Sequence, residues 1–167
     1  MRLNTYLTES TTNVIIKKPN QCTKEEKITF VDLVISGNQN REEHVLKTFR
    51  SLVYVGFLYE NDEIMAVSSI KKGRTISFEK AGVPDEAENY PYEVGFSFTS
   101  PKSRGKGYNT ILKKKIFSKI KGYGVYATIR IDNKASLSVN KKFGFTELGE
   151  PYQGIVTDVK LLVYDNK

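Results

Sequence analysis

Apolar residues recur along this chain with two spacings, every second position in some segments and every third or fourth position in others. The first spacing is typical of half-buried strands, and the second is typical of amphipathic helices. Thr23, followed three residues later by Glu26, has the pattern of a capping box and predicts where the first helix starts. The predicted elements, in chain order, are strand 13–17, helix 23–36, helix 41–52, hairpin strands 53–59 and 63–71, short strand 75–78, loop 82–91, strand 92–99, helix 111–120, strand 125–131, helix 133–142, and closing strands from 145 and over 156–164.

The helix over 111–120 shows how this pattern assigns an inner and an outer face. Its apolar positions predict a buried face that includes Ile111 and Leu112. Its lysines, Lys113 and Lys114 among them, are expected on the side that faces water.

A glycine-containing segment over 99–110 lies between the strand over 92–99 and the helix that follows. Glycine permits positive φ angles and lets the backbone approach a ligand, and N–H groups at a helix N-terminus bind anions. Arg104 and Lys106 add positive charge at the same place. The segment is therefore a candidate phosphate site, and a turn with solvated basic side chains is the alternative. It is neither a Walker loop nor a dinucleotide fingerprint, because G-x-x-x-x-G-K-[ST] is absent and Thr110 replaces the third glycine of G-x-G-x-x-G.

Charge is unevenly distributed over the 167 residues, whose formal net charge is +7. Residues 102–142 contain twelve Lys or Arg and one acid, Asp132. Residues 79–93 contain five acids and one base, Lys80. The basic region favours a polyanionic ligand or solvated helix faces, and the acidic stretch favours a cationic substrate or a solvated loop.

Composition argues against several kinds of site. Cys22 is the only cysteine and His44 the only histidine, so the sequence offers no internal disulfide, no Ser/His/Asp set and no metal cluster. A single cysteine suits a reducing compartment. No run of 18 apolar residues predicts a membrane span, and the N-terminus lacks the pattern of a signal peptide. We therefore expect one domain over 1–167, in the cytoplasm, with no metal and no membrane contact.

The element order and two motifs resemble the GNAT superfamily of acetyl-CoA-dependent N-acetyltransferases. Residues 101–109 are similar to that family's R/Q-x-x-G-x-G/A pyrophosphate loop, with Arg104 first and Asn109 at the final Gly/Ala position. Residues 133–145 are similar to its N-x-x-[AS]-x-x-x-[YN]-x-x-x-G-F block. The resemblance implies an α/β (α+β) fold, with a central mixed, mostly antiparallel sheet of roughly six to seven strands flanked by about four helices.

The resemblance also implies where acetyl-CoA binds. Main-chain groups at the end of the strand over 92–99 would contact the pantetheine arm and the thioester carbonyl, and would act on the carbonyl oxygen as an oxyanion hole does. Asn133 would contact the pantetheine, and Ser136 would lie near the cofactor. The other implied cofactor-binding residues are Ser97, Phe98 and Thr99 in that strand, and Arg104, Gly105, Lys106, Gly107, Tyr108, Asn109 and Thr110 around the pyrophosphate.

For catalysis, the resemblance implies direct acetyl transfer to an amine. Glu93, where some family members carry a catalytic Glu, is the candidate base, directly or through water, and a solvent-facing or salt-bridged residue is the alternative. Asn140 stands where many members place a tyrosine that protonates the leaving thiolate, and an amide cannot act as a general acid. Tyr108, Tyr123, Tyr126 or water are the candidates to replace it.

Three functions stay open on the sequence alone. The first is N-acetylation of an amine on a small molecule or a protein. The second is a GNAT-fold acyltransferase or binding protein that acts on nucleic acid or a ribonucleoprotein, as the basic region 102–142 would allow. The third is a non-catalytic acyl-CoA-binding interaction module, as Asn140 would allow. The last strand also leaves a homodimer open.

Overall fold

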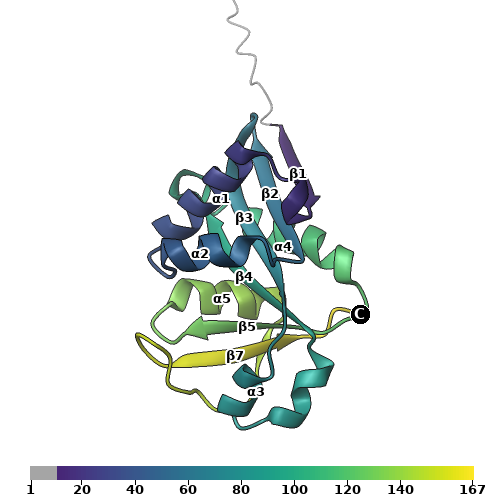
Figure 1. Ribbon diagram of the computed structural model, residues 1–167, viewed down its shortest axis with the longest axis vertical. Coiled ribbons are helices and arrows are strands. Elements are labelled where there is room, and N and C mark those ends of the chain that lie inside the picture. The colour runs from purple at the N-terminus through teal and green to yellow at the C-terminus, as the bar shows by residue number, and fades with distance from the viewer. Residues whose placement is uncertain (1–10) are drawn as a thin grey trace, which may run out of the picture.

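The computed structural model describes residues 11–167, and seven strands within them form one sheet in the order β1-β2-β3-β4-β5-β7-β6 (Figure 1). The strands are β1 (Thr12–Lys17), β2 (Tyr54–Glu60), β3 (Glu63–Lys72), β4 (Tyr92–Thr99), β5 (Val125–Arg130), β6 (Thr146–Glu147) and β7 (Val159–Tyr164). The α-helices are α1 (Lys24–Ser36), α2 (Glu42–Phe49), α3 (Ile76–Lys80), α4 (Tyr108–Phe117) and α5 (Lys134–Phe143). The short 3-10 helices are η1 (Pro19–Gln21), η2 (Pro84–Asn89), η3 (Pro101–Ser103) and η4 (Ser118–Ile120).

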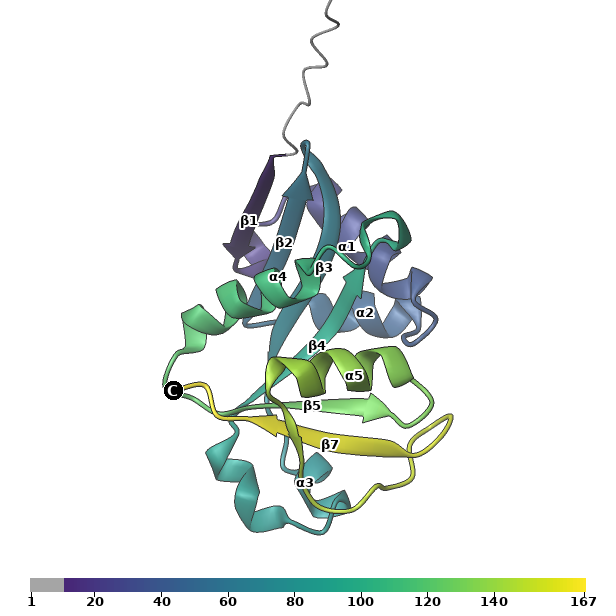
Figure 2. The same cartoon turned by 180° about the vertical axis from the view of Figure 1, so that it is seen from behind.

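Neighbouring strands are antiparallel except for β4 and β5, which run parallel. The two parallel strands pair at two positions, Tyr92 with Val125 and Glu93 with Tyr126, and then diverge (Figures 1 and 2). The sheet is therefore mixed and mostly antiparallel, as the resemblance implies. It opens toward the carboxyl ends of β4 and β5.

Helices cover both faces of this sheet. Helices α1 and α2 lie on one face of the β1–β4 part, and α4 lies on the other (Figures 1 and 2). Phe30 of α1 is fully buried, and its ring lies 5.3 Å from Phe49 of α2, 6.3 Å from Phe57 of β2 and 6.4 Å from Phe96 of β4, between ring centroids. Helix α5 covers β5 and β7 on the same side as α4 (Figure 2). This aromatic packing fixes the α1–α2 pair on β4, beside the opening.

The start of α1 confirms the predicted capping box. The Thr23 hydroxyl accepts a hydrogen bond from the Glu26 N–H (3.1 Å), and the Glu26 carboxylate accepts one from the Thr23 N–H (2.9 Å). The same carboxylate also binds the Lys17 ammonium (2.8 Å) and the Tyr59 hydroxyl (2.9 Å). One buried acid therefore links β1, α1 and β2.

Three expected segments differ in the structure. Residues 75–78 were expected as a strand, but α3 forms there because Phe78 is fully buried with its ring centroid 4.9 Å from that of Tyr126. The expected loop over 82–91 contains the 3-10 helix η2. The last strand starts at Val159 and not at 156, and the side chains of Ile155 and Val156 before it are 95% and 71% exposed.

Helix α4 is rotated relative to the prediction from its apolar positions. Ile111, expected in the core, is 46% exposed, whereas Lys113, expected in water, is 2% exposed. The central stripe, Leu112 and Ile116, is buried as predicted. Helix α5 packs on the flank of α4 that carries Lys113, and the opposite flank with Ile111 is left in water.

Two kinds of feature are missing from the described part of the chain. None of the helices within 11–167 has the length and apolar character needed to cross a lipid bilayer. Among the same residues, His, Cys, Asp and Glu side chains do not gather in threes in a way that could hold a metal ion.

Candidate functional site

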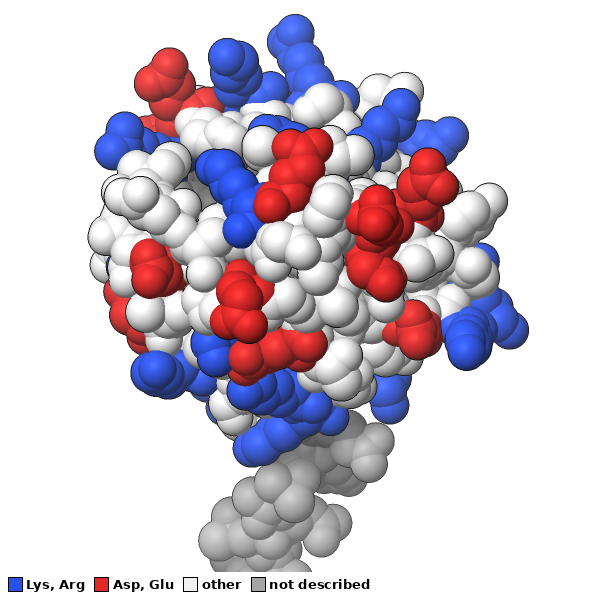
Figure 3. Space-filling model, turned by 90° about the horizontal axis from the view of Figure 1, so that it is seen from below, with Lys and Arg blue, Asp and Glu red and all other residues white. Residues whose placement is uncertain are grey.

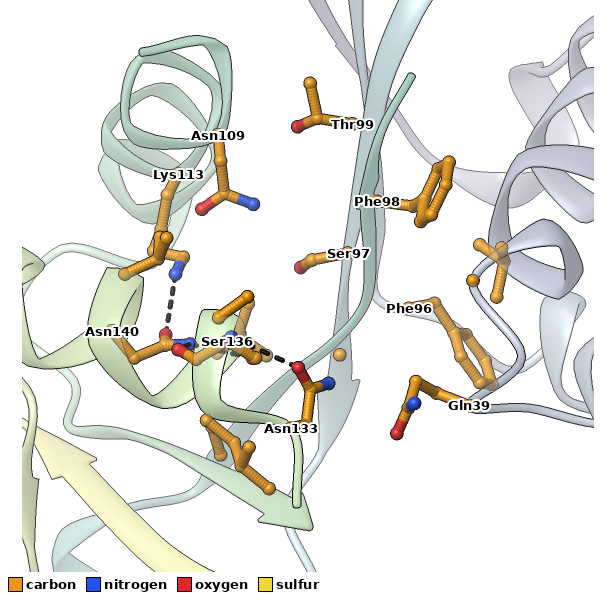
Figure 4. A pocket seen from close by; sticks show the side chains of 18 of the residues that line it. Gln39, Phe96, Ser97, Phe98, Thr99, Asn109, Lys113, Asn133, Ser136 and Asn140 are labelled. Atoms are coloured by element: carbon orange, nitrogen blue, oxygen red, sulfur yellow. Dashed lines mark hydrogen bonds between the residues drawn. The ribbon is translucent and has the colours of Figure 1, made fainter. Parts of the chain in front are cut away.

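A cavity of about 800 Å³ lies where β4 and β5 diverge. It is lined by the α1–α2 connection, β4, the glycine loop, the start of α4, β5 and the start of α5 (Figure 4). Nearly all of the site residues expected from the sequence lie on its wall. These are Glu93, Ser97, Phe98, Thr99, Arg104, Gly105, Gly107, Tyr108, Asn109, Thr110, Asn133, Ser136 and Asn140.

Strand β4 carries a bulge where it borders the cavity. On β3, Val67 pairs with Phe98 and Ser69 pairs with Gly95, so two residues of β4 face one residue of β3. Phe96 has a φ of +49°, which is rare for a residue with a side chain. A bulge interrupts the ladder and leaves main-chain groups unpaired. The backbone around 96–98 can therefore serve a ligand in the cavity.

The glycine loop after β4 has the backbone geometry of an anion site. Gly105 and Gly107 have φ values of +79° and +75°, and a Cβ built on either would meet nothing within 4 Å. These glycines are needed for their conformation and leave open space above the loop. Gly107 is the N-cap of α4 and makes no side-chain cap, so the first N–H groups of α4 have no partner within the helix.

Glu60, at the end of β2, anchors this loop from the side away from the cavity. Its buried carboxylate accepts hydrogen bonds from the Lys106 ammonium (2.8 Å), the Tyr108 hydroxyl (2.7 Å) and the Ser103 hydroxyl (3.4 Å). The hydrogen bond that the Lys106 ammonium donates to the Glu60 carboxylate raises the pKa of Lys106. The Lys106 side chain, expected to add charge at the phosphate site, is thus engaged with Glu60. No motif in the sequence indicates that Glu60 anchors the loop.

Arg104 lies on the loop with its guanidinium bent back toward β4. Its Nε donates to the Thr99 carbonyl oxygen over 3.4 Å, and the guanidinium carbon lies 5.6 Å from the centroid of the Phe98 ring. The positive charge therefore remains beside the cavity, at the junction of β4 and the loop.

A chain of hydrogen bonds connects α4 to α5 across the wall of the cavity (Figure 4). The Lys113 ammonium donates to the Asn140 amide oxygen over 2.6 Å, and the Asn140 amide nitrogen donates to the Ser136 carbonyl oxygen over 2.8 Å. Asn133 caps α5 by accepting from the Ser136 N–H (3.2 Å). Burial lowers the pKa of Lys113 to about 8. Sequence reasoning missed Lys113 because helical spacing alone does not say which flank of α4 a neighbour covers.

Asn109 has an unusual environment in the first turn of α4. Its side-chain oxygen is buried and has no hydrogen-bond partner among residues 11–167. Figure 4 shows this side chain directed into the cavity between α4 and β4. A buried oxygen without a partner is costly, so it marks a place where a ligand N–H would be stabilised.

Glu93 lies where β4 and β5 begin to separate. Its carboxylate oxygen is 3.4 Å from the Lys71 ammonium and 3.5 Å from the Thr128 hydroxyl. The Lys71 ammonium also lies 4.3 Å from the centroid of the Phe96 ring. Glu93 therefore forms a salt bridge with Lys71 and also lines the cavity. The salt bridge does not remove it as a candidate base.

The acids that precede Glu93 in the sequence lie elsewhere. Glu79, Asp85 and Glu88 are exposed on or after α3 and in η2. The end of the molecule that carries these elements shows acidic side chains with basic ones around them (Figure 3). Within 79–93, the carboxylate that lines the cavity is that of Glu93. Of the acids over 79–93, Glu93 is therefore the one placed to attract a cationic substrate into the cavity.

Comparisons with known proteins bear on this geometry. Residues 21–145 match the family model described as the acetyltransferase (GNAT) family. Searched against curated proteins, the chain has no match.

Solved structures share the fold over nearly the whole chain. An acyl-CoA N-acyltransferase from Pseudomonas aeruginosa is 14% identical with a TM-score of 0.63, covering 92% of this chain and 99% of its own. The ribosomal-protein-S18-alanine N-acetyltransferase from Escherichia coli is 10% identical with a TM-score of 0.66, covering 93% and 95%. The structure of yncA from Salmonella typhimurium with its cofactor acetyl-CoA is 16% identical with a TM-score of 0.63, covering 95% of both chains.

Proposed function

Because this chain belongs to the GNAT acetyltransferase family, we propose that it transfers the acetyl group of acetyl-CoA to a primary amine, by direct attack while both substrates are bound. One observation carries the proposal. The bulge at Phe96, the glycine loop and the N-terminus of α4 all face the same cavity of about 800 Å³. Acetyl transfer requires backbone donors for the thioester carbonyl and for the diphosphate of acetyl-CoA, next to space for the amine.

The residues of the cavity suit the parts of acetyl-CoA. The main chain of the glycine loop and the first N–H groups of α4 would hold the diphosphate, with Arg104 adding charge. The main chain at the bulge of β4, where Phe96 and Ser97 stand opposite one residue of β3, would bind the pantetheine arm and polarise the thioester carbonyl. Asn109, whose side chain lies in the cavity between α4 and β4, would contact the pantetheine arm.

We assign Glu93 to the amine. Near neutral pH a primary amine is largely protonated and must lose a proton before it attacks. The Glu93 carboxylate lines the cavity and would accept this proton directly or through water. Lys71 and Thr128 would hold the carboxylate in place.

The acceptor would enter from the side of the α1–α2 connection. Figure 4 shows Gln39 and Phe96 on the side of the cavity away from Asn109 and Lys113. Arg130, on β5, also lines the cavity and is paired with Asp132. Because Asp132 offsets the charge of Arg130, the Glu93 carboxylate is the group on this wall that would attract an amine acceptor.

The proposal is tested by mixing the purified full chain with acetyl-CoA and a panel of primary amines. The panel should contain a simple monoamine, a polyamine, amino acids and a short peptide with a free N-terminus. Thiol release is followed with a colorimetric disulfide reagent, and mass spectrometry identifies the acetylated amine. We expect at least one amine to accelerate thiol release above hydrolysis. Calorimetric binding of acetyl-CoA without transfer to any amine would refute the proposal, and would favour the non-catalytic acyl-CoA-binding module instead.

A further inference from the structure

Lys113 is a lysine buried in the wall of the proposed acetyl-CoA cavity. It is 2% exposed, and within the described residues its ammonium contacts one amide and two aromatic rings. The amide is that of Asn140 on α5, and the rings are those of Phe143 and Phe145, with centroids 5.2 and 5.4 Å away. None of these partners is titratable. Burying a lysine without a carboxylate partner destabilises the fold, so a purely structural role does not account for Lys113.

The tyrosines that could donate a proton in the cavity are engaged elsewhere. The Tyr108 hydroxyl donates to Glu60 behind the glycine loop. The Tyr126 hydroxyl accepts from the Arg74 N–H over 2.9 Å, and its ring packs on α3. Tyr123 is half exposed and packs on Tyr92, after the end of α4. None of these three tyrosines is therefore placed to protonate the leaving thiolate of CoA.

We propose that Lys113 donates the proton to the CoA sulfur as the acetyl group is transferred. This inference rests on the proposed acetyl transfer. The amine nitrogen forms a bond to the carbonyl carbon, the carbon–sulfur bond breaks, and its electron pair goes to sulfur. Lys113 supplies the proton that makes this sulfur a thiol and becomes a neutral amine. The proton lost by the attacking amine goes to Glu93 or water and returns to Lys113 through solvent.

Burial makes Lys113 suitable for this step. An ordinary lysine holds its proton too tightly to protonate a thiolate well, since alkyl thiols titrate near pH 8.5 and lysine near 10.4. Desolvation lowers the pKa of Lys113 to about 8, so its acidity matches that of the leaving thiol. The faces of Phe143 and Phe145 still support the charged form.

Asn140 is then a positioning residue. Its amide oxygen fixes the Lys113 ammonium at 2.6 Å, and its amide nitrogen is held by the Ser136 carbonyl oxygen. Figure 4 shows Lys113 and Asn140 meeting on the cavity wall across from Ser97 of the bulged strand. Asn140 accepts a hydrogen bond from Lys113, and Lys113 would supply the proton that a tyrosine hydroxyl at position 140 would otherwise supply.

The first test compares Lys113→Met with Lys114→Met, an exposed control on the same helix. We expect K113M to lower kcat about a hundredfold while its affinity for acetyl-CoA stays within a few-fold of that of the wild-type protein. The wild-type kcat should fall above about pH 8, and K113M should lack this fall. K114M should behave as wild type. Unchanged kcat in K113M, or loss of acetyl-CoA affinity in parallel with kcat, would overturn the proposal.

The second test needs no acceptor and so separates this inference from the proposed function. The thiol of bound CoA is titrated by the ultraviolet absorbance of its thiolate. We expect a lower thiol pKa on the wild-type protein than on K113M, because the Lys113 ammonium stabilises the thiolate. Asn140→Asp should raise the pKa of Lys113 and move the high-pH fall of kcat upward. Identical thiol titrations would refute the role of Lys113, whatever amine the protein acetylates.

Discussion

Gly107→Ala tests the glycine loop most directly, because the chain contains a matched control. Gly107 and Gly82 have φ values of +75° and +76°, and a Cβ on either would meet no atom within 4 Å. Gly107 is the N-cap of α4 beside the cavity, whereas Gly82 follows α3 at the other end of the sheet. Alanine at either position carries the same left-handed strain of about 1–2 kcal/mol. Each variant should therefore lose about 2–8 °C in Tm without ligand.

Acetyl-CoA should separate the two variants. At a hundred times its Kd, a ligand stabilises the protein by about 2.7 kcal/mol, which is about 5–11 °C for a chain of this size. Gly82→Ala should keep this shift. In Gly107→Ala the new methyl group occupies the space over the loop and the backbone resists the required φ. A tenfold weaker Kd would leave about 1.4 kcal/mol, half of the shift, at the same ligand concentration.

Differential scanning fluorimetry over a series of acetyl-CoA concentrations measures both effects, and calorimetry gives the Kd directly. Equal shifts in the two variants would show that the main chain at Gly107 does not contact the ligand. Loss of the shift in Gly82→Ala alone would place the binding site at the wrong end of the molecule.

The remaining predictions concern three acids. Glu93→Gln should lower kcat most at low pH, where the acceptor amine is protonated, and an unchanged pH–rate profile would remove Glu93 as the base. Glu60→Gln should raise KM for acetyl-CoA several-fold with little change in kcat, because the hydrogen bonds that Lys106 and Tyr108 donate to Glu60 weaken. Steady-state kinetics measures both constants, and a fall in kcat at unchanged KM would contradict this role of Glu60. The pKa of Glu26 is lowered overall. Burial acts to raise it, but the hydrogen bonds from Lys17, the Thr23 N–H and Tyr59 have the larger effect. The stability gained is present above the unfolded pKa and is lost as pH falls through the folded one, so urea unfolding of Glu26→Gln should vary less with acid pH than that of the wild-type protein.

Much of the fold follows from the sequence alone. The hairpin of β2 and β3, strand β4 and the helix after the glycine loop were all predicted, because alternation and turn residues report on local structure. The capping box at Thr23 was predicted for the same reason. Both motifs reach one cavity because β4, α4, β5 and α5 follow one another in the chain.

What the sequence did not predict depends on contacts between distant elements. The bulge at Phe96 places a positive φ on a residue that shows no preference for it. Burial of Lys113 and exposure of Ile111 depend on where α5 packs against α4, and helical periodicity cannot supply that. The same limit hid Glu60, whose partners in the glycine loop lie more than 40 positions further along the chain.

The divergence of β4 and β5 has a consequence for altering this protein. The opening between β4 and β5 arises from the directions of two backbones that pair only at Tyr92 and Glu93 of β4. We therefore expect that Gln39 and Arg130, which line the cavity, can be exchanged without closing the opening. A library at these two positions should yield folded proteins that differ in the molecule they accept.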